Sequence, residues 1–446
     1  ILIGLVGSEM CIRDRYYILF LLLAGFCFNS CVSEEEDLFD KSAAERMNEA
    51  LTKYKAILQD DPQGWVMEFY PSDRSMGGYT YTAKFDNGKV DMTSELSLNS
   101  SSGDKWPAGT VVTSYYRVIS EQSALLTFDT YNLLFHFFSE PRGSSDVDGY
   151  ASDYEFVFME VSEDRIVLKG KKYGNKMVMT KLTESAGSYM QKVLDMQEKM
   201  AAVPRMKMVV GGKEYTVSMV GKLLSYTDMK EDSSLENIDM AYIYTPDGIN
   251  LYEPLTVNGI TFQRLVYDDA TGAIKATDAD VSFPYPTALE QFCGTTSQWY
   301  LSFDIAAGTG DMDKELMDLF SNAYAINKST QYEEFIGWYI GANSAYPGND
   351  TNPYCMGWES NWLGLQVWDV AYGYKMSIID EASKKISLQS TAPGINYDFY
   401  VFLDPIIEYV DAHSPYTVEF DDDQTPTTAK LVSTVDNKVW FSLTKQ

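Results

Sequence analysis

The spacing of hydrophobic residues predicts a helix near the start of the chain. Within residues 41–61, apolar side chains recur every three or four positions, as on one face of an α-helix. The residues of this stripe are Ala44, Met47, Leu51, Tyr54 and Leu58. Asp40 or Ser42 can cap the first turn, and Pro62 with Gly64 ends the helix.

From Gly64 onward the hydrophobic spacing changes to a period of two, which is typical of β-strands. Eight strand-like runs follow one another: GWVMEFYP, GYTYTAKF, KVDMTSELS, TSYYRVIS, LLTFDTYN, YEFVFMEVS, RIVLKGKK and NKMVMTKL. Turn signals such as Asp86-Asn87-Gly88 separate them. Sequential antiparallel strands with short links predict an eight-stranded meander or a lipocalin-like barrel. The interior of such a barrel is either packed with side chains or just large enough for one small ligand.

Helical and strand-like segments alternate in the rest of the chain. A second helix is predicted over Glu184–Ala202, and strands return over residues 205–290. After the FPYPT motif, helices are predicted near Asp313–Ala325 and Tyr332–Tyr339, and Asp311 is expected to cap the first of them.

The C-terminal part of the chain contains segments similar to the first β unit. GYTYTAKFDNGKVDM compares with GYKMSIIDEASKKISL, and DRIVLKGKKYGNKMVMTKL compares with TAKLVSTVDNKVWFSLTKQ. One hypothesis is a degenerate internal repeat that relates residues 65–182 to residues 365–446. The alternative is that hairpins of this composition resemble one another without a shared origin.

An apolar run near the start of the sequence predicts export from the cytoplasm. The run YYILFLLLAGFCF, residues 16–28, is too short to span a hydrocarbon core of about 30 Å as a helix. Its length and the preceding arginines instead suit a secretory signal, which is cleaved after a small residue. Phe26 precedes Cys27, whereas Ser30 precedes Cys31, so Cys31 is the cysteine that fits.

This pattern resembles a bacterial lipoprotein signal, which implies that Cys31 becomes the lipidated first residue. An ordinary secretory cut near Ser30 with a free thiol is the alternative. The following VSEEED resembles the acidic export signal that sends Bacteroidetes lipoproteins to the outer face of the outer membrane. Residues 1–15 do not read naturally into the signal and are interpreted as non-native sequence.

The overall prediction is a mainly β protein with a few helices (α+β). It comprises an N-terminal eight-stranded meander or barrel, a middle β segment and a second related C-terminal β unit. The expected segments are a signal peptide with its lipoprotein cysteine over 1–31, an acidic tether over 32–40, a helix plus barrel-like domain with a closing helix over 41–204, the middle segment over 205–290, and an α+β unit over 291–446.

Charge and motif content exclude several classes of function. Acidic residues outnumber basic ones, 64 to 35, and the net charge of −29 repels nucleic acid. The two histidines, His136 and His413, lie far apart in the chain, and His136 is expected in a strand. No GxGxxG, P-loop or GxSxG motif occurs, and neither Asp311-x-Asp313 nor Asp421-Asp422-Asp423 has EF-hand spacing. We therefore nominate no catalytic residue, no metal site and no cofactor.

Aromatic residues are the one enrichment with functional content, with 32 tyrosines and 8 tryptophans. Trp358, Trp362 and Trp368 cluster in CMGWESNWLGLQVWD, and Trp106 lies in the loop SSSGDKWPAGT. Aromatic faces stack on sugar rings, so these tryptophans either form a binding platform or pack a core.

Two cysteines of the mature part, Cys293 and Cys355, could form a disulfide outside the cytoplasm.

Longer segments carry a resemblance to a known family. They include KSAAERMNEALTKYKAILQDDPQGWVMEFYP, SDYEFVFMEVSEDRIVLKGKKYGNKMVMTKL and YTPDGINLYEPLTVNGITF. Together they resemble a domain-of-unknown-function family of Bacteroidetes surface lipoproteins. The resemblance implies an outer-membrane location and company with starch-utilisation-type nutrient uptake systems, and it supplies no catalytic residues.

The leading hypothesis is a non-enzymatic, lipid-anchored surface protein that binds a glycan or another nutrient for an uptake system. One alternative is an interaction or scaffolding subunit that contacts partner lipoproteins. Another is a small-ligand carrier with a lipocalin-like cavity. A hydrolase is disfavoured, because histidine and nucleophile motifs are missing.

Overall fold

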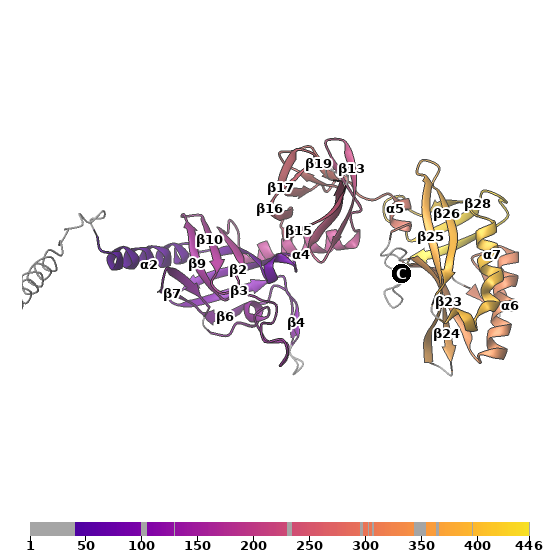
Figure 1. Ribbon diagram of the computed structural model, residues 1–446, viewed down its shortest axis with the longest axis horizontal. Coiled ribbons are helices and arrows are strands. Elements are labelled where there is room, and N and C mark those ends of the chain that lie inside the picture. Colours follow the sequence, from indigo (N-terminus) through magenta and orange to yellow (C-terminus); the bar gives the residue numbers. More distant parts are fainter. Residues whose placement is uncertain are drawn as a thin grey trace, which may run out of the picture.

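The computed structural model describes residues 41–99, 105–128, 130–229, 234–294, 298–301, 303–305, 307–342, 354–362, 365–394 and 396–445. Within these residues the protein is mainly β with six helices, and its strands form three antiparallel barrel-like units in sequence order (Figure 1). The predicted fold class is thereby confirmed. None of the helices in these residues combines the length and the apolar character needed to span a bilayer.

The first unit begins with helix α2 (Ala43–Gln59), in which Ser42 and Glu45 form a capping box. A nine-stranded sheet follows in the order β6-β3-β2-β1-β11-β10-β9-β8-β7. Its strands are β1 (Trp65–Tyr70), β2 (Tyr79–Asp86), β3 (Lys89–Ser94), β6 (Val112–Tyr115), β7 (Arg117–Ser120), β8 (Ala124–Thr127), β9 (Glu155–Val161), β10 (Arg165–Gly170) and β11 (Lys176–Lys181). Short elements beside the sheet are η1 (Ser72–Arg74), β4 (Leu98–Asn99), β5 (Lys105–Trp106) and α3 (Leu133–His136).

The sheet has nine strands because one predicted run divides in two. TSYYRVIS breaks at Tyr116 into β6 and β7, which lie at opposite edges of the sheet. The buried Tyr116 donates its N–H to the Gly88 carbonyl at 2.9 Å, and its ring meets that of Phe85 edge-on at 4.7 Å. The chain therefore passes from one edge to the other, and the sheet nearly closes on itself.

The interior of the first unit is filled with side chains. Phe69 lies 5.3 Å from Phe135 and 5.8 Å from Phe156, measured between ring centroids. Met67, Tyr81, Met92, Phe128 and Met177 belong to the same buried cluster. The sequence allowed either a packed interior or one that holds a small ligand, and the interior is packed.

The second unit is a closed eight-stranded barrel. Its strands are β12 (Lys207–Val210), β13 (Lys213–Val220), β14 (Leu223–Met229), β15 (Leu235–Thr245), β16 (Gly248–Val257), β17 (Ile260–Tyr267), β18 (Ile274–Ala276) and β19 (Val281–Phe283). Helix α4 (Ala186–Ala202) was expected to close the first unit. Its apolar face, which includes Met190, Val193 and Met196, packs into the core of this second barrel, and the helix also contacts β2 and β3 of the first unit.

The first two units share a buried interface. The Gly78 amide donates to the Tyr242 carbonyl at 3.0 Å, and the Thr80 hydroxyl donates to the Tyr244 carbonyl at 2.9 Å, which joins β2 to β15. A Cβ on Gly78 would lie 2.6 Å from the ring of Tyr70, so only glycine permits this close approach. Tyr70 itself packs in a small cluster with residues of β15.

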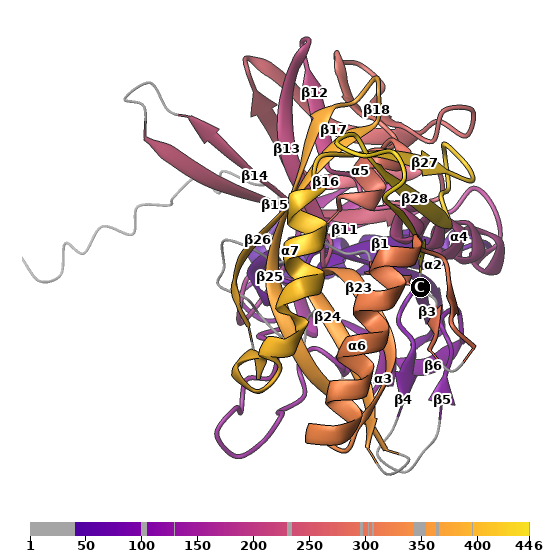
Figure 2. The same ribbon diagram turned by 90° about the vertical axis from the view of Figure 1, so that its right-hand side faces the viewer.

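The third unit is a second closed eight-stranded barrel. Helices α6 (Lys314–Thr330) and α7 (Asp404–Ala412) flank it and lie side by side in both views (Figures 1 and 2). Its strands are β20 (Gln298–Leu301), β23 (Glu334–Ala342), β24 (Tyr354–Trp362), β25 (Leu365–Asp380), β26 (Lys385–Pro393), β27 (Tyr416–Phe420), β28 (Thr428–Ser433) and β29 (Trp440–Lys445). The helices are α5 (Ala288–Phe292), α6 (Lys314–Thr330), α7 (Asp404–Ala412), η2 (Tyr397–Phe399) and η3 (Val401–Leu403), and β21 (Phe303–Asp304) pairs with β22 (Thr309–Gly310).

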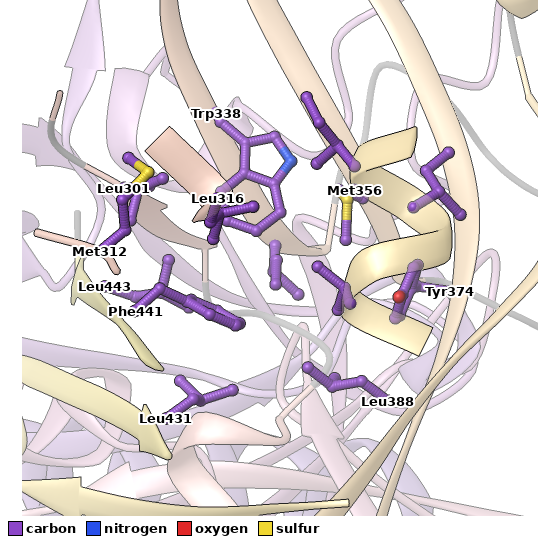
Figure 3. Packing of buried hydrophobic residues seen from close by; sticks show 14 of the residues in the cluster. Leu301, Met312, Leu316, Trp338, Met356, Tyr374, Leu388, Leu431, Phe441 and Leu443 are labelled. Atoms are coloured by element: carbon purple, nitrogen blue, oxygen red, sulfur yellow. The ribbon is translucent and has the colours of Figure 1, made fainter. Parts of the chain in front are cut away.

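Tryptophan and phenylalanine rings form the centre of the third core. The indole of Trp338 lies 5.3 Å from the Phe320 ring of α6 and 5.6 Å from the Phe441 ring of β29. Figure 3 shows Trp338 and Phe441 with Leu316, a residue of α6, close by. The helices therefore complete the core that the barrel begins.

Two local predictions for the third unit are wrong. The segment Tyr332–Tyr339 was expected to be helical, but Glu334–Ala342 is strand β23, because its aromatic and β-branched residues fit a pleated sheet. The N-cap of α6 is Asp313 rather than Asp311, since the Asp313 carboxylate accepts the Leu316 amide at 3.0 Å.

Strand positions bear on the proposed internal repeat. Hairpin β10–β11 and hairpin β28–β29 each end their unit, so the second pair of similar segments occupies equivalent positions. The first pair of similar segments does not occupy equivalent positions. Strands β2 and β3 follow the first strand of their unit, whereas β25 and β26 lie in the middle of the third barrel. The third barrel also starts at residue 298 rather than 365. Closure by pairing of the first strand with the last is common to the two closed barrels.

Candidate functional site

The structure places the predicted tryptophans in or against cores where it describes them. Trp358 on β24 is 1% exposed and lies opposite Trp338 on β23, inside the third barrel. It cannot belong to an exposed platform. Trp106 is half-buried against the first core. Trp362 and Trp368 lie on β24 and β25, and their side chains fall outside the described residues.

The disulfide that the sequence allows is not formed, because Cys293 and Cys355 are not bonded to each other. Cys293 ends α5 and packs against the third core, whereas Cys355 lies in a separate cluster with Tyr339 and Ala371. Burial raises the pKa of Cys293 to about 12 and that of Cys355 to about 11, so neither is a reactive thiolate at neutral pH. Cys31 and the acidic tether lie outside the described residues.

An exposed set of stacked rings lies instead on the first unit. The His136 ring stacks on that of Tyr154 at 5.3 Å and 26°, and it lies 5.6 Å from the ring of Tyr131. Tyr131 is 57% exposed and Tyr154 44% exposed. We call Tyr131, His136 and Tyr154 the aromatic strip. Large exposed rings held in a row present stacking area that loses little side-chain entropy on binding.

Asn132 positions the aromatic strip. Its buried side chain accepts the Leu134 amide at 3.1 Å and donates to the Ser114 hydroxyl at 3.0 Å, which starts helix α3 beside β6. His136 is therefore at the end of a short helix and not in the strand that the sequence predicted. A short apolar run such as LLFHFF fits a helix or a strand equally well, and here the Asn132 cap favours the helix. Burial lowers the pKa of His136.

A pocket of about 230 Å³ adjoins the aromatic strip at Tyr154. It lies between the loop before β9 and the turn that joins β10 to β11, and we call it the loop pocket. Residues that line it include Asp148, Ser152, Asp153, Lys171, Lys172 and Tyr173. The strip and the pocket thus form one surface with ring faces at one end and polar groups at the other.

Asp153 holds the turn that forms one wall of the loop pocket. Its carboxylate accepts the amides of Lys172 at 2.6 Å, Tyr173 at 3.0 Å and Asn175 at 3.1 Å. In return, the Asn175 side-chain carbonyl accepts the Asp153 amide at 2.7 Å. Gly170 leaves room for this arrangement, because a Cβ there would lie 1.8 Å from Asp153 Oδ2. The turn is therefore built before any ligand arrives.

The polar groups around the loop pocket are paired and charged. Lys172 lies 2.9 Å from Asp148, whose carboxylate also accepts the Tyr173 hydroxyl at 2.5 Å. The Tyr173 hydroxyl lowers the pKa of Asp148, with a further contribution from Lys172. Among the described residues, the buried Ser152 Oγ of the lining has no hydrogen-bond partner. Fixed acceptors and ammonium donors suit a ligand with many hydroxyl groups.

Two further cavities lie on the second unit. One of about 770 Å³ is open and spans β13, β14 and the β15 end, with acidic residues in its wall. The other, of about 370 Å³, lies between the first and second units. The described part of the chain contains no cluster of three or more His, Cys, Asp or Glu side chains suited to a metal ion.

Sequence reasoning missed the aromatic strip because its members are distant in the chain. Tyr131 and His136 precede a long loop, and Tyr154 follows it, so only the fold brings the three rings together. The available signal was tyrosine in polar, glycine-containing loops such as GYASDYEF and GKKYGN. Tryptophan density drew attention to the third unit instead.

A family model described as "Domain of unknown function (DUF4302)" matches residues 35–269. That range contains the first unit, α4 and the second barrel through β17, which are the parts joined by the β2–β15 interface. A search of curated proteins finds no match.

The solved structures that match include three sliding clamps of DNA polymerase III, each with low identity and a low TM-score. The clamp from Pseudomonas aeruginosa, solved with griselimycin, has 9% identity, a TM-score of 0.12, and coverage of 89% of this chain and 97% of its own. The clamp from Caulobacter crescentus has 9% identity, a TM-score of 0.09, and coverage of 88% of this chain and 95% of its own. The clamp from Thermotoga maritima has 9% identity, a TM-score of 0.09, and coverage of 85% of this chain and 90% of its own. TM-scores this low support no structural or functional inference.

Proposed function

The chain belongs to the DUF4302 family, and on that premise we propose that it is a non-enzymatic lipoprotein of the Bacteroidetes outer-membrane surface that binds a glycan beside a nutrient uptake system. The observation that carries the binding function is the aromatic strip next to the loop pocket. The sequence features that motivate the location are Cys31 after a secretory signal and the acidic run VSEEED.

Glycan binding fits the chemistry of this surface. The rings of Tyr131 and Tyr154 offer flat apolar faces for the C–H groups of a pyranose ring. The loop pocket next to them offers carboxylates and ammonium groups for sugar hydroxyls. Ser152 is not activated as a nucleophile, because its Oγ has no hydrogen-bonded base in the described part of the chain.

Affinity electrophoresis tests the site. The protein starting at Val32 is run in native gels that contain members of a polysaccharide panel. We expect retardation by at least one glycan, and a loss of about tenfold in affinity in Tyr154→Ala, because truncation of an aromatic contact commonly costs more than about 1 kcal/mol. Tyr154→Phe keeps the ring and is expected to keep the retardation.

Variants in the third unit are the matched controls. Tyr332→Ala removes an exposed ring elsewhere and should leave the retardation unchanged. Loss of retardation in Trp362→Ala, with Tyr154→Ala unaffected, would move the site to the third unit. Unchanged migration across the whole panel would contradict glycan binding.

The anchor has its own test. In a Bacteroidetes host, the full chain should label with radioactive palmitate and be degraded by proteinase K added to intact cells. Cys31→Ala should abolish both the label and the membrane fraction. Labelling that persists in this variant would contradict lipidation at Cys31.

An exposed apolar patch favours a second candidate, a scaffolding subunit that binds partner lipoproteins. Tyr332 is 77% exposed, Phe399 69% and Val401 57%, and the Gln331 side chain joins the two segments by donating to the Phe399 carbonyl at 3.1 Å. Large exposed apolar patches commonly mark protein contacts. A pull-down from outer membranes that loses a partner with Tyr332→Ser/Phe399→Ser would support this candidate.

The lipocalin-like carrier is the weakest alternative. Such a carrier needs a cavity inside the barrel, whereas aromatic and methionine side chains fill the interior of the first unit.

A further inference from the structure

The cavity of about 370 Å³ between the first two units differs from the rest of the molecule in charge. We call it the junction cavity, and it lies between β2, α4, the β13–β14 turn and the β15 strand. Arg205 and Lys222 line it, and its described lining contains no Asp or Glu. The whole chain carries 64 acidic residues against 35 basic ones, and both of the other cavities described above contain carboxylates.

Lys222 is held in place from the first unit. Its ammonium group lies 2.8 Å from the buried Glu95 carboxylate and donates to the Gly78 carbonyl at 2.9 Å. The same group lies 3.8 Å from the centre of the Tyr79 ring, a cation–π distance. Burial lowers the pKa of Lys222, and the Glu95 charge opposes that shift. Glu95 therefore offsets the charge of Lys222 from behind the cavity wall.

Arg205 has no such counter-charge. It is 1% exposed and donates to the Val203 carbonyl and, at 2.5 Å, to the Gly272 carbonyl. Within the described ranges it forms no ion pair, and its Nε–H has no partner. Its guanidinium lies 5.0 Å from the centre of the Tyr285 ring and 6.0 Å from that of Tyr267, which offsets part of the cost of burial. Without a carboxylate partner, it keeps capacity for an anion.

The remaining walls are apolar or carry tyrosine hydroxyls. Met200 comes from α4, Met219 and Val220 come from β13, and Tyr242 and Tyr244 come from β15. Burial raises the pKa of Tyr242 and of Tyr244, so both hydroxyls stay protonated at neutral pH, and they hydrogen-bond to each other. The cavity therefore combines cationic and hydroxyl donors with methionine and valine surface.

We propose that the junction cavity binds a small amphipathic organic anion, with its carboxylate or sulfonate group toward Arg205 and its apolar body against Met200, Met219 and Val220. The volume is within the range of about 300–1,000 Å³ that is usual for small-molecule sites. Because the walls come from both units, the bound anion would contact each of them. This site is separate from the aromatic strip and does not depend on glycan binding.

Fluorescence titration of the chain starting at Val32 tests the proposal. Anilinonaphthalene sulfonate carries one anionic group on an aromatic body, and N-phenylnaphthylamine is its neutral counterpart. We expect the sulfonate to bind at one saturable site and more tightly than the neutral probe. Absence of a saturable sulfonate site, or equal affinities for the two probes, would overturn the proposal.

Rim variants locate the bound anion without disturbing the core. Val220 lines the cavity and is 64% exposed, so it tolerates polar replacement. Val220→Glu places a negative charge at the rim and should weaken sulfonate binding by about threefold to tenfold through repulsion. Val220→Gln has nearly the same shape as Val220→Glu without its charge, so the sulfonate should bind the Gln variant about threefold to tenfold more tightly than the Glu variant.

The neutral probe completes the design, because it should bind Val220→Glu and Val220→Gln equally. A sulfonate affinity that is the same in both variants would place the probe elsewhere and overturn the proposal. Arg205→Met should remove the preference for the sulfonate, and circular dichroism checks that this variant, which alters a buried residue, is folded.

Discussion

The buried tryptophans of the third unit and the aromatic strip of the first unit have opposite roles. In the third unit, Trp299, Trp338 and Trp358 are buried in the core between the barrel strands and α6. In the first unit, Tyr131 and Tyr154 flank His136 at the surface. Strand pairing explains the first arrangement, because Trp338 and Trp358 are cross-strand partners on one inward face. Loop geometry explains the second.

The comparison shows that the density of aromatic residues in a sequence does not indicate exposure. The tryptophan-rich segment of the third unit is a strand pair, and alternation turns every second side chain inward. Tyr131 and Tyr154 of the aromatic strip precede helix α3 and strand β9, where the side chains can remain exposed. Removing members of each group should therefore have different consequences.

The largest effect is expected in the third core. Trp358→Ala should lower the stability of the third unit by about 3–5 kcal/mol, because it empties a large buried site. Chemical denaturation followed by tryptophan fluorescence measures this change. Tyr332→Ala, an exposed ring in the same unit, serves as the control and should shift the transition by less than about 0.5 kcal/mol. Equal effects of the two variants would contradict the buried assignment of Trp358.

A glycine beside the loop pocket gives the next largest effect. Gly170→Ala should destabilise the first unit by about 1–3 kcal/mol and weaken glycan retention, because the new methyl group collides with Asp153. Gly187→Ala is the matched control, since a Cβ at this α4 position meets no atom within 4 Å. Thermal unfolding and affinity electrophoresis of both variants would show whether the Asp153 arrangement supports the site.

Protonation of His136 tests the aromatic strip with a smaller effect. Burial lowers its pKa, so the folded state takes up the proton at lower pH than the unfolded chain, whose histidine titrates near about 6.5. Between these values the unfolded state holds more protons, and stability rises with pH. This contribution is present above about pH 6.5 and is lost as the pH falls toward the folded pKa.

Proton NMR of the two histidines measures this titration, and His413→Gln assigns the signals. Tyr154→Ala removes one of the stacked rings and should move the His136 midpoint upward. A His136 midpoint at or above about 6.5 in the unaltered protein would contradict a half-buried ring.

The smallest effect on stability is expected for the exposed rings themselves. Tyr154→Ala should change the free energy of unfolding by less than about 1 kcal/mol, because the residue is 44% exposed and belongs to no buried core. Its effect on glycan retention should be much larger than that of Trp358→Ala measured under conditions where both proteins are folded. A large loss of stability would mean that Tyr154 has a structural role.

Local patterns predicted much of the fold because each rests on short-range physics. The amphipathic stripe and Ser42 led to α2, and two-residue alternation led to the strands of the first unit. The division at Tyr116 was not predicted, because an apolar run carries no mark of the point where a strand changes edges. The segment around Trp338 was misassigned as a helix, since short apolar runs fit either period.

The candidate site could not be predicted, because it depends on contacts between distant segments. Trp358 was chosen for its residue type, and the structure buries it. Arg205 gave no signal as a single basic residue, and its isolation from carboxylates exists only after β12, α4 and the Gly272 turn come together. The pairing of Cys293 with Cys355 was not predictable for the same reason, because the number of residues between two cysteines does not determine their distance in the fold.

In each unit the first strand pairs with the last. Trp65 pairs with Lys181, Val210 with Val281 and Trp299 with Lys445. During synthesis, no unit can be completed until its last strand has been made. Until then, one edge of the first strand has no hydrogen-bond partner. Folding of this protein should advance in three steps along the chain, each finished by one late strand, and an interruption within a unit would leave an edge open to other chains.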